Sequence, residues 1–207
     1  MLKLNKNSVF IIHFQPIELY PPALNILQIL AQESKFTNII LVSFKSPYVH
    51  KIDKHEQIRY VRVSQFGKNK WSRLLSYVIF YLKTIQYLIA QRPSKVIYFE
   101  SISSIPAILY KFFFRKSRIF VHYHEYTSPL EYRQGMLVNR ISYRLEKWYY
   151  HKFEWISHTN EDRIRLFLND VQINPDEKIN EMPNYPPKSW INLAKCESKL
   201  NAHKTKF

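Results

Sequence analysis

The stretch that decides the fold runs from Lys95 to His124, KVIYFESISSIPAILYKFFFRKSRIFVHYH. It begins with KVIYFES (Lys95–Ser101), a short β-branched and aromatic run that is typical of a buried strand. A helix is expected from about Ser104, whose hydroxyl suits a helix cap and which is followed by Pro106 in the first turn. The run RIFVHYH (Arg118–His124) is the next expected strand. Strand, helix and strand in this order predict a parallel βαβ unit.

The same alternation of strands and helices extends over most of the chain. Other strands are expected at Ser8–Phe14, Asn38–Phe44, Ile58–Ser64, Phe153–Ser157 and Lys178–Pro183. Other helices are expected at Pro21–Ser34, Trp71–Ala90 and Gln134–Lys152 and after Thr159, with a polar loop over Thr127–Pro129. This order predicts an α/β fold with one Rossmann-like parallel sheet of six or seven strands and helices on both faces. The domain is expected to span residues 1–187, and residues 188–207 are expected to be a polar tail or a truncated interdomain linker.

Helical spacing also predicts which side chains face the sheet. In the helix at 71–90, the expected inward set is Leu74, Val78, Leu82, Ile85 and Ile89. In the helix at 134–152, the expected inward set is Leu137, Ile141, Leu145 and Trp148. Thr159 and Asp162 have the spacing of a capping box at the start of the last helix.

Composition limits the classes of function. The 207 residues carry a formal net charge of +15, which predicts attraction to polyanions such as nucleic acid, anionic lipid or a phosphorylated substrate. The single cysteine, Cys196, excludes a disulfide framework and favours a cytoplasmic location. Because only two glycines occur, the sequence has neither a G-x-G-x-x-G loop nor a Walker A loop. The longest apolar run, Leu74–Ala90, is too short and too polar to be expected as a transmembrane helix.

Polar residues gather where the expected strands end. In parallel sheets of this kind, ligands bind beyond the carboxyl ends of the strands. Those ends are followed here by the loops after Phe14, Ser101, His124 and Ser157. The candidate site residues closest to these ends are His13, Gln15, Glu100, His124 and Glu125.

The two histidines of VHYHEY allow three interpretations. His122 and His124 lie two residues apart on a strand, so their side chains point the same way. A metal site needs further ligands, and because His13 is the only plausible helper, no metal is expected. The second interpretation is a hydrogen-bonded, buried histidine with an exposed one at the strand end. The third is a site histidine at the mouth of the sheet that lacks deep packing.

Three segments carry a resemblance to a known family. VHYHEY, EKWYYHKFEWISHTNEDRIRLFL and MPNYPP, in this order over Arg118–Pro187, resemble the N-terminal half of family 4 GT-B glycosyltransferases. By this resemblance, His124 matches the histidine that faces the transferred sugar, and Glu125 matches the acidic residue beside it. That neighbouring carboxylate is expected to favour the imidazolium form of His124. Asn160 and Arg163 match an N-x-x-R pattern near the substrate, although a helix cap and a solvated charge explain them equally well.

The resemblance implies an activity and its limits. Members of the family transfer sugar, with retention, from a nucleotide-sugar to a glycan or lipid-linked acceptor, and they need no metal or other cofactor. The C-terminal domain that binds the nucleotide in the family, with its E-x7-E segment, has no counterpart in these 207 residues. The isolated chain is therefore expected to be inactive. The first loop, HFQPIELYPP, also departs from the glycine-rich family pattern, so the acceptor geometry is not carried over.

Two other functions compete with this hypothesis. One is a noncatalytic remnant or subunit that needs a separate C-terminal half. The other is a basic nucleic-acid-binding module, but the sequence has no RRM signature, zinc finger or KH loop, so no nucleic acid is expected as a partner. ILYKFFFRKSR (Ile108–Arg118) mixes aromatic and basic residues, which suits either a core helix with a basic end or contact with an anionic membrane. The expected location is cytoplasmic, including a peripheral one at the inner face of the membrane.

Overall fold

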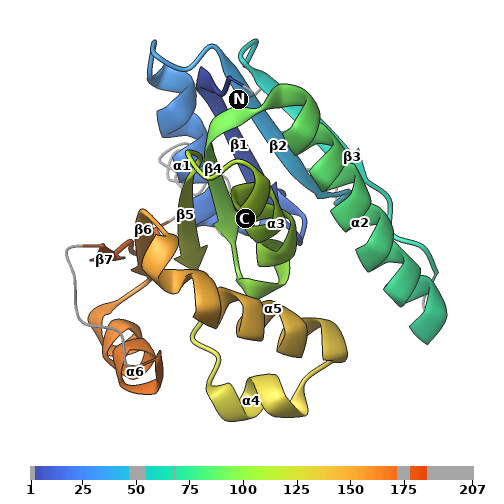
Figure 1. Ribbon diagram of the computed structural model, residues 1–207, viewed down its shortest axis with the longest axis vertical. Helices are drawn as coiled ribbons and strands as arrows, with labels where there is room; N and C mark the ends of the chain where they lie inside the picture. Colours follow the sequence, from blue (N-terminus) through green and yellow to red (C-terminus); the bar gives the residue numbers. More distant parts are fainter. Residues whose placement is uncertain (1–2, 47–54, 68, 172–177, 186–207) are drawn as a thin grey trace, which may run out of the picture.

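The strands form one parallel sheet in the computed structural model, which describes residues 3–46, 55–67, 69–171 and 178–185. Within these residues the sheet has seven strands in the order β3-β2-β1-β4-β5-β6-β7 (Figure 1). Their bounds are β1 (Asn5–His13), β2 (Asn38–Phe44), β3 (Ile58–Val63), β4 (Pro93–Phe99), β5 (Arg118–Tyr123), β6 (Trp155–His158) and β7 (Ile179–Glu181). The order reverses direction between β1 and β4, which is where such sheets bind ligands at their carboxyl edge.

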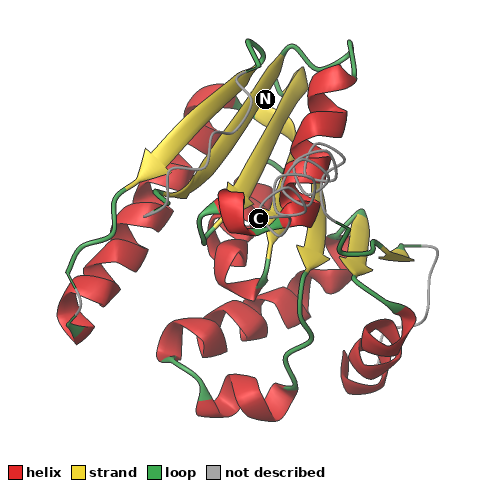
Figure 2. Cartoon of the chain, turned by 180° about the vertical axis from the view of Figure 1, so that it is seen from behind, coloured by secondary structure: helices red, strands yellow, loops and turns green. Residues whose placement is uncertain are grey.

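Helices cover both faces of the sheet, but unequally (Figure 2). On one face lies α1 (Pro21–Gln32), which follows the 3-10 turn η1 (Ile17–Leu19). The other face carries α2 (Lys70–Gln91), α3 (Ser104–Phe113), α5 (Leu137–Tyr149) and α6 (Glu161–Val171). The short α4 (Pro129–Gln134) precedes α5, and two further 3-10 turns are η2 (Ser101–Ser103) and η3 (Tyr150–Lys152).

The predicted fold class is confirmed. Each predicted strand is present, and the central strands are apolar on both sides because helices cover both faces. In β1, for example, Phe10 and Ile12 pack with the α2–α3 side, whereas Val9 and Ile11 pack with the α1 side. The tail predicted at residues 188–207 lies outside the described residues. Among the described helices, none is both long and apolar enough to cross a membrane.

The inward face predicted for α2 is wrong. The helix buries Ser76, Phe80, Thr84 and Leu88, while Leu82 of the predicted inward set is 62% exposed. The helix is apolar on nearly all sides, so spacing alone does not select a face. Phe80 decides the orientation, because its ring packs against the rings of Phe14 and Phe44. The two buried hydroxyls are satisfied within the helix, where Ser76 donates to the Ser72 carbonyl and Thr84 to the Phe80 carbonyl.

The helix predicted at 134–152 is also corrected. It is interrupted at Gly135, and a separate helix, α4, begins at Pro129, where the predicted loop ends, with a capping box between Ser128 and Glu131. Of the predicted inward set of α5, only Leu145 packs partly against the core, and Leu137 is 70% exposed. Glu146 is buried instead: its Oε1 accepts hydrogen bonds from the hydroxyls of Tyr98 (2.6 Å) and Tyr123 (2.8 Å).

Two predicted helix caps also differ. Ser104 makes no capping hydrogen bond, and the hydroxyl of its neighbour Ser103 accepts from the backbone N–H of Phe14 at 3.0 Å. This bond ties the end of β1 to the start of α3. At α6, the cap is the residue after Thr159: the Oδ1 atom of Asn160 accepts from the backbone N–H of Arg163 at 2.9 Å.

The Glu146 carboxyl gives a first prediction, on stability as a function of pH. Burial raises the pKa of Glu146 from 4.5 to about 7, although the tyrosine hydrogen bonds oppose this shift. The folded protein then holds a proton that the unfolded chain has lost, so stability falls as pH rises from about 4.5 to about 7. This decrease in the free energy of unfolding is roughly 3 kcal/mol, and Glu146→Gln should abolish it. Urea denaturation of both proteins across that range measures it, and a pH-independent difference between them would contradict the assignment.

Candidate functional site

A row of mostly polar residues crosses the sheet near the carboxyl ends of its strands. His13 of β1 lies between Ser43 of β2 and Phe99 of β4. Phe99 pairs with His122 of β5, which pairs with Ser157 of β6. This register places the row at the carboxyl edge of the sheet, on the side of α1. Sequence analysis predicted the candidate site at this edge.

His124 follows the end of β5 and is packed against this row. Its side chain is only 5% exposed, and its ring stacks on Phe99 with centroids 5.3 Å apart. Tyr20 stacks on His124 at 4.8 Å, and Nε2 of His124 lies 3.4 Å from Nε2 of His13. The expectation of a mouth histidine without deep packing is therefore wrong, because the loop after β1 brings Tyr20 over the imidazole.

Hydrogen-bond partners determine the protonation of this histidine pair. Nδ1 of His13 lies 2.7 Å from the carbonyl oxygen of Gln15, which only accepts, so Nδ1 carries the proton. Nε2 of a neutral His13 is then an acceptor, and His124 donates to it from its own Nε2. Nδ1 of His124 is left as an unprotonated acceptor with no partner in the described part of the chain.

Both imidazoles are neutral at neutral pH. Burial, together with smaller effects of the nearby His13, His122 and Arg163, lowers the pKa of His124 to about 2. Burial likewise lowers the pKa of His13 to about 4. The expectation that Glu125 favours the imidazolium form of His124 is therefore wrong. The Glu125 side chain is exposed to solvent, and desolvation of the ring has the larger effect.

Glu100 holds the loop that carries His124. Its Oε1 accepts from the backbone N–H of His124 at 2.6 Å and from that of Glu125 at 3.4 Å. Burial raises the pKa of Glu100 to about 8, and these two hydrogen bonds only partly oppose it. The backbone of Glu100 is left-handed, with φ of 62° and ψ of 149°. Such strain in a residue other than glycine is typical of functional sites.

Arg163 holds the same loop from the other side. Its guanidinium donates to the carbonyl oxygen of His124 and to the hydroxyl of Thr159. Asn160 caps α6, as described above, and its side chain is exposed. The helix-cap alternative for Asn160 is thus confirmed. Arg163 is not a solvated charge, because it is partly buried and bonded to the loop.

The predicted site residues thus fall into two groups. His13, Glu100, His124 and Arg163 are brought together around the loop after β5. The side chains of Gln15, Glu125 and Asn160 are exposed. Of these three, Gln15 contributes its carbonyl oxygen to the histidine pair.

Sequence analysis missed an ion pair that positions Tyr20. Arg62 at the end of β3 contacts Glu18 of η1, with Nη2 and Oε1 2.9 Å apart, and both side chains are largely buried. The Arg62 guanidinium also donates to the hydroxyl of Ser43. This contact holds η1 on the sheet, and η1 ends one residue before Tyr20. The only signal in the sequence was Arg62 itself, a charged residue near the end of a predicted strand.

His122 has a structural role. Its Nδ1 lies 2.9 Å from the hydroxyl of Ser157, which itself donates to the carbonyl oxygen of Val121 at 3.2 Å. The interpretation of one hydrogen-bonded, buried histidine is confirmed for His122, whereas the exposed histidine that accompanied it is not found at His124. Within the described ranges, no group of three or more His, Cys, Asp or Glu side chains has a metal-binding arrangement.

Comparison with known proteins adds the fold family. No protein-family model and no curated protein matches the sequence. Among solved structures, the chain is similar to the lipopolysaccharide outer core galactosyltransferase WaaB, with TM-score 0.55 and 15% identity over 84% of this chain and 44% of that one. It is also similar to UDP-N-acetylglucosamine 2-epimerase from Rickettsia bellii, with TM-score 0.57 and 15% identity over 98% and 50%.

A third similar structure is sucrose-phosphate synthase from Thermosynechococcus elongatus, with TM-score 0.58 and 11% identity over 96% of this chain and 99% of that one. The chain spans about half the length of the galactosyltransferase and epimerase chains. At these identities the comparison establishes fold alone. The chain has the fold of an N-terminal GT-B domain.

The packing of His124 gives a second prediction. Because its ring contacts Phe99, Tyr20 and His13, His124→Ala should create a cavity and destabilise the fold by about 2 kcal/mol or more. Gln15→Ala is the matched control, since the Gln15 side chain is exposed and should change stability by no more than about 0.5 kcal/mol. Chemical denaturation measures both. Equal stability of His124→Ala and Gln15→Ala would show that the His124 ring is not packed as described.

Proposed function

We propose that this chain is the N-terminal half of a retaining glycosyltransferase of the family 4 type. It takes part in transferring a sugar from a nucleotide-sugar to a glycan or lipid-linked acceptor. The observation that carries the proposal is the group formed by His13, Glu100 and His124 at the carboxyl edge of a GT-B-type sheet. The location that fits is the cytoplasmic side of an anionic membrane, in keeping with a net charge of +15.

The proposed roles follow from protonation and exposure. His124 presents an unpartnered Nδ1 acceptor, so it accepts a hydrogen bond from a sugar hydroxyl rather than donating one. That atom is buried under Tyr20, and the ring of Tyr20 must swing aside for the sugar to reach it. His13 fixes the tautomer of His124 through the contact between their Nε2 atoms.

The acceptor side of the proposed site is the exposed rim. Glu125 orients an acceptor hydroxyl, and the Gln15 and Asn160 carboxamides contribute hydrogen bonds to hydroxyl groups. Arg163 and Glu100 act as positioning residues, because they hold the loop from its carbonyl and N–H sides.

The nucleotide and its pyrophosphate belong to the second half in this proposal. The solved galactosyltransferase and epimerase chains are about twice as long as the stretch that matches this chain. Without a second domain, water reaches the leaving phosphate and the cleft does not close, so orientation and charge stabilisation are lost.

A noncatalytic subunit is the second candidate function. It is favoured by one observation: Nδ1 of His124 is fully enclosed, and the Tyr20 ring covers the imidazole. In that case the residues around His124 only stabilise the loop after β5, and the sugar chemistry lies wholly in a partner.

A third prediction separates these two functions. In an assembly with a matching C-terminal half, His124→Gln should lower turnover about a hundredfold or more, because a positioned hydrogen-bonding group is lost from the transition state. His151→Ala is the control, since His151 is exposed on η3 and remote from the site. Turnover is measured with a panel of UDP- and GDP-sugars and membrane lipid extract, per mole of folded protein. Unchanged turnover of the folded His124→Gln variant would favour the noncatalytic subunit.

A fourth prediction concerns the chain by itself. The isolated 207-residue protein should show negligible sugar transfer and weak or absent binding of UDP- and GDP-sugars, because the proposed nucleotide site lies in the second half. Isothermal calorimetry measures the binding. Tight binding of a nucleotide-sugar to this chain would place the donor site within these residues and contradict the proposal that the second half binds the nucleotide.

A further inference from the structure

A pocket lies at the carboxyl ends of β5 and β6, on the face of the sheet opposite the row that contains His13 and His122. Tyr123 and His158 pair at the ends of these strands, and because side chains alternate along a strand, both point to the face away from α1. The loop after β5 and the helices α4, α5 and α6 surround the pocket (Figure 1). We call it the His158 pocket. Its wall is largely aromatic and contains Tyr123, Tyr126, Tyr132, Tyr143, Tyr150 and Phe167.

His158 lines this pocket without a hydrogen-bond partner. Its side chain is 2% exposed, and neither Nδ1 nor Nε2 bonds to a residue in the described part of the chain. Its ring stacks on Tyr123 with centroids 4.9 Å apart and contacts Phe167 at 4.8 Å. Burial, together with a smaller effect of Arg163, lowers the pKa of His158 to about 4, so the imidazole is neutral at neutral pH. Because buried polar side chains are normally hydrogen-bonded, an unpartnered imidazole beside a pocket indicates a ligand.

Two carboxylates line the same pocket. Glu125 is exposed and Asp170 of α6 is half-buried. Neither forms an ion pair with another described residue, although the chain has 31 Lys and Arg residues. Asp170 also lies in the last turn of α6, where the helix dipole disfavours a negative charge. The pocket therefore combines negative charge with a neutral imidazole nitrogen that accepts a hydrogen bond.

The size and chemistry of the pocket fit a primary ammonium group. The cavity has a volume of about 20 Å³, and a group the size of water needs roughly 10–15 Å³. The hydroxyls of Tyr123 and Tyr132 bond to Glu146 and Ser101, so these tyrosines offer their rings. Aromatic rings and carboxylates both attract a cation. A metal ion is disfavoured, because the described His, Cys, Asp and Glu side chains form no group of three or more suited to one.

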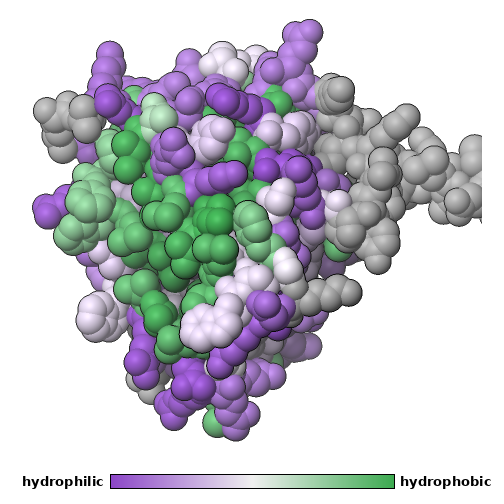
Figure 3. All heavy atoms as spheres, turned by 90° about the vertical axis from the view of Figure 1, so that its right-hand side faces the viewer, coloured by the Kyte–Doolittle hydropathy of each residue, from purple (hydrophilic) through white to green (hydrophobic). Residues whose placement is uncertain are grey.

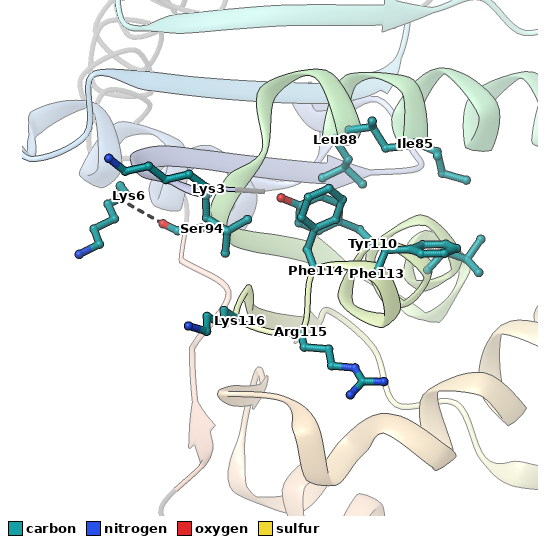
Figure 4. A pocket seen from close by; sticks show the side chains of 13 residues that line it. Lys3, Lys6, Ile85, Leu88, Ser94, Tyr110, Phe113, Phe114, Arg115 and Lys116 are labelled. Carbon is teal, nitrogen blue, oxygen red and sulfur yellow. Dashed lines mark hydrogen bonds between the residues drawn. The ribbon is translucent and has the colours of Figure 1, made fainter. Parts of the chain in front are cut away.

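A larger groove at the other end of the sheet has the reverse charge. It lies between α2 and α3, has a volume of about 1380 Å³ and is lined by apolar residues such as Ile85 and Leu88. Figure 4 shows Lys3, Lys6 and Lys116 together on one side of it, and none of the described residues that line it is acidic. Figure 3 shows hydrophobic side chains gathered on the side of the molecule where α2 lies. Of these two hollows, only the His158 pocket has acceptors for a cation.

We propose that the His158 pocket binds the primary ammonium group of a small amine. An ammonium group has three N–H donors and no acceptor. It donates one hydrogen bond to the imidazole of His158 and the others to the carboxylates of Glu125 and Asp170. The rest of the amine lies in solvent beside Glu125, whose side chain is exposed. A trimethylated ammonium does not fit, because it is larger and has no N–H.

This site goes beyond the proposed sugar transfer. Glu125 also lies on the exposed rim described for the acceptor, so the amine belongs to the acceptor if the transferase proposal holds. That assignment rests on the proposed function, whereas the binding of an amine does not. Because the binding experiment uses the isolated chain and no sugar transfer, the two proposals fail separately.

Nuclear magnetic resonance titration of the full chain tests the ligand class. Ethanolamine is the probe, and choline and ethylene glycol are its matched controls at constant ionic strength. Ethanolamine should produce a saturable shift of the ring ¹⁵N signals of His158, which are assigned by their absence from His158→Phe. Choline and ethylene glycol should leave these signals unchanged. No response to ethanolamine would overturn the proposal, as would an equal response to choline or to ethylene glycol.

A pair of double variants tests the two carboxylates. Glu125→Gln/Asp170→Asn should weaken ethanolamine binding by about tenfold or more, because two charged acceptors are lost. The control Glu33→Gln/Glu56→Gln removes two exposed carboxylates near α1 and β3 and should weaken binding far less. Urea denaturation checks that the first variant folds, which is expected because Asp170→Asn removes an unfavourable charge from the end of α6. Equal weakening in both variants would mean that only net charge matters, and would overturn the site.

Discussion

The buried carboxyl of Glu146 determines which side of α5 faces the sheet. Tyr98 and Tyr123 point from neighbouring strands toward α5, and an unsatisfied buried hydroxyl costs about 1–3 kcal/mol. Glu146 supplies one acceptor for both, so α5 turns its polar residue inward and leaves Leu137 and Trp148 in solvent. The exposure of these apolar residues of α5 is therefore a consequence of hydrogen bonding inside the core. Glu146 also lies close enough to Glu100 to help keep that carboxyl protonated.

The strands and the long helices were predictable from sequence because the central strands are apolar and the connections between strands are long enough for crossover helices. The orientation of the helices was not. In α2 every side of the helix carries apolar residues. The side that faces the sheet is the one with Phe80, because its ring packs against the rings of Phe14 and Phe44. In α5 the usual rule that glutamate faces solvent fails, because Tyr98 and Tyr123 donate to Oε1 of Glu146. These tyrosines are distant in sequence, so the helical pattern of α5 does not reveal them.

The candidate site was predictable only in part, for a similar reason. Register in a parallel sheet brings strand ends together, so the proximity of His13, Glu100 and His124 follows from the strand boundaries. The Tyr20 ring over His124 depends on η1, which is held on the sheet by the ion pair between Glu18 and Arg62 of the distant strand β3. The protonation state of His124 is determined by the burial of its ring, and not by Glu125, its neighbour in sequence.

The charge state of the site limits what this half contributes to sugar transfer. At neutral pH the His13 and His124 rings are neutral and the carboxyl of Glu100, with a pKa of about 8, is mostly protonated. The guanidinium of Arg163 is engaged with a backbone carbonyl and a hydroxyl. Such a site offers hydrogen bonds suited to sugar hydroxyls but little positive charge for a pyrophosphate. In the proposed function, phosphate recognition must therefore come from the second half, while the excess positive charge of this half serves the membrane.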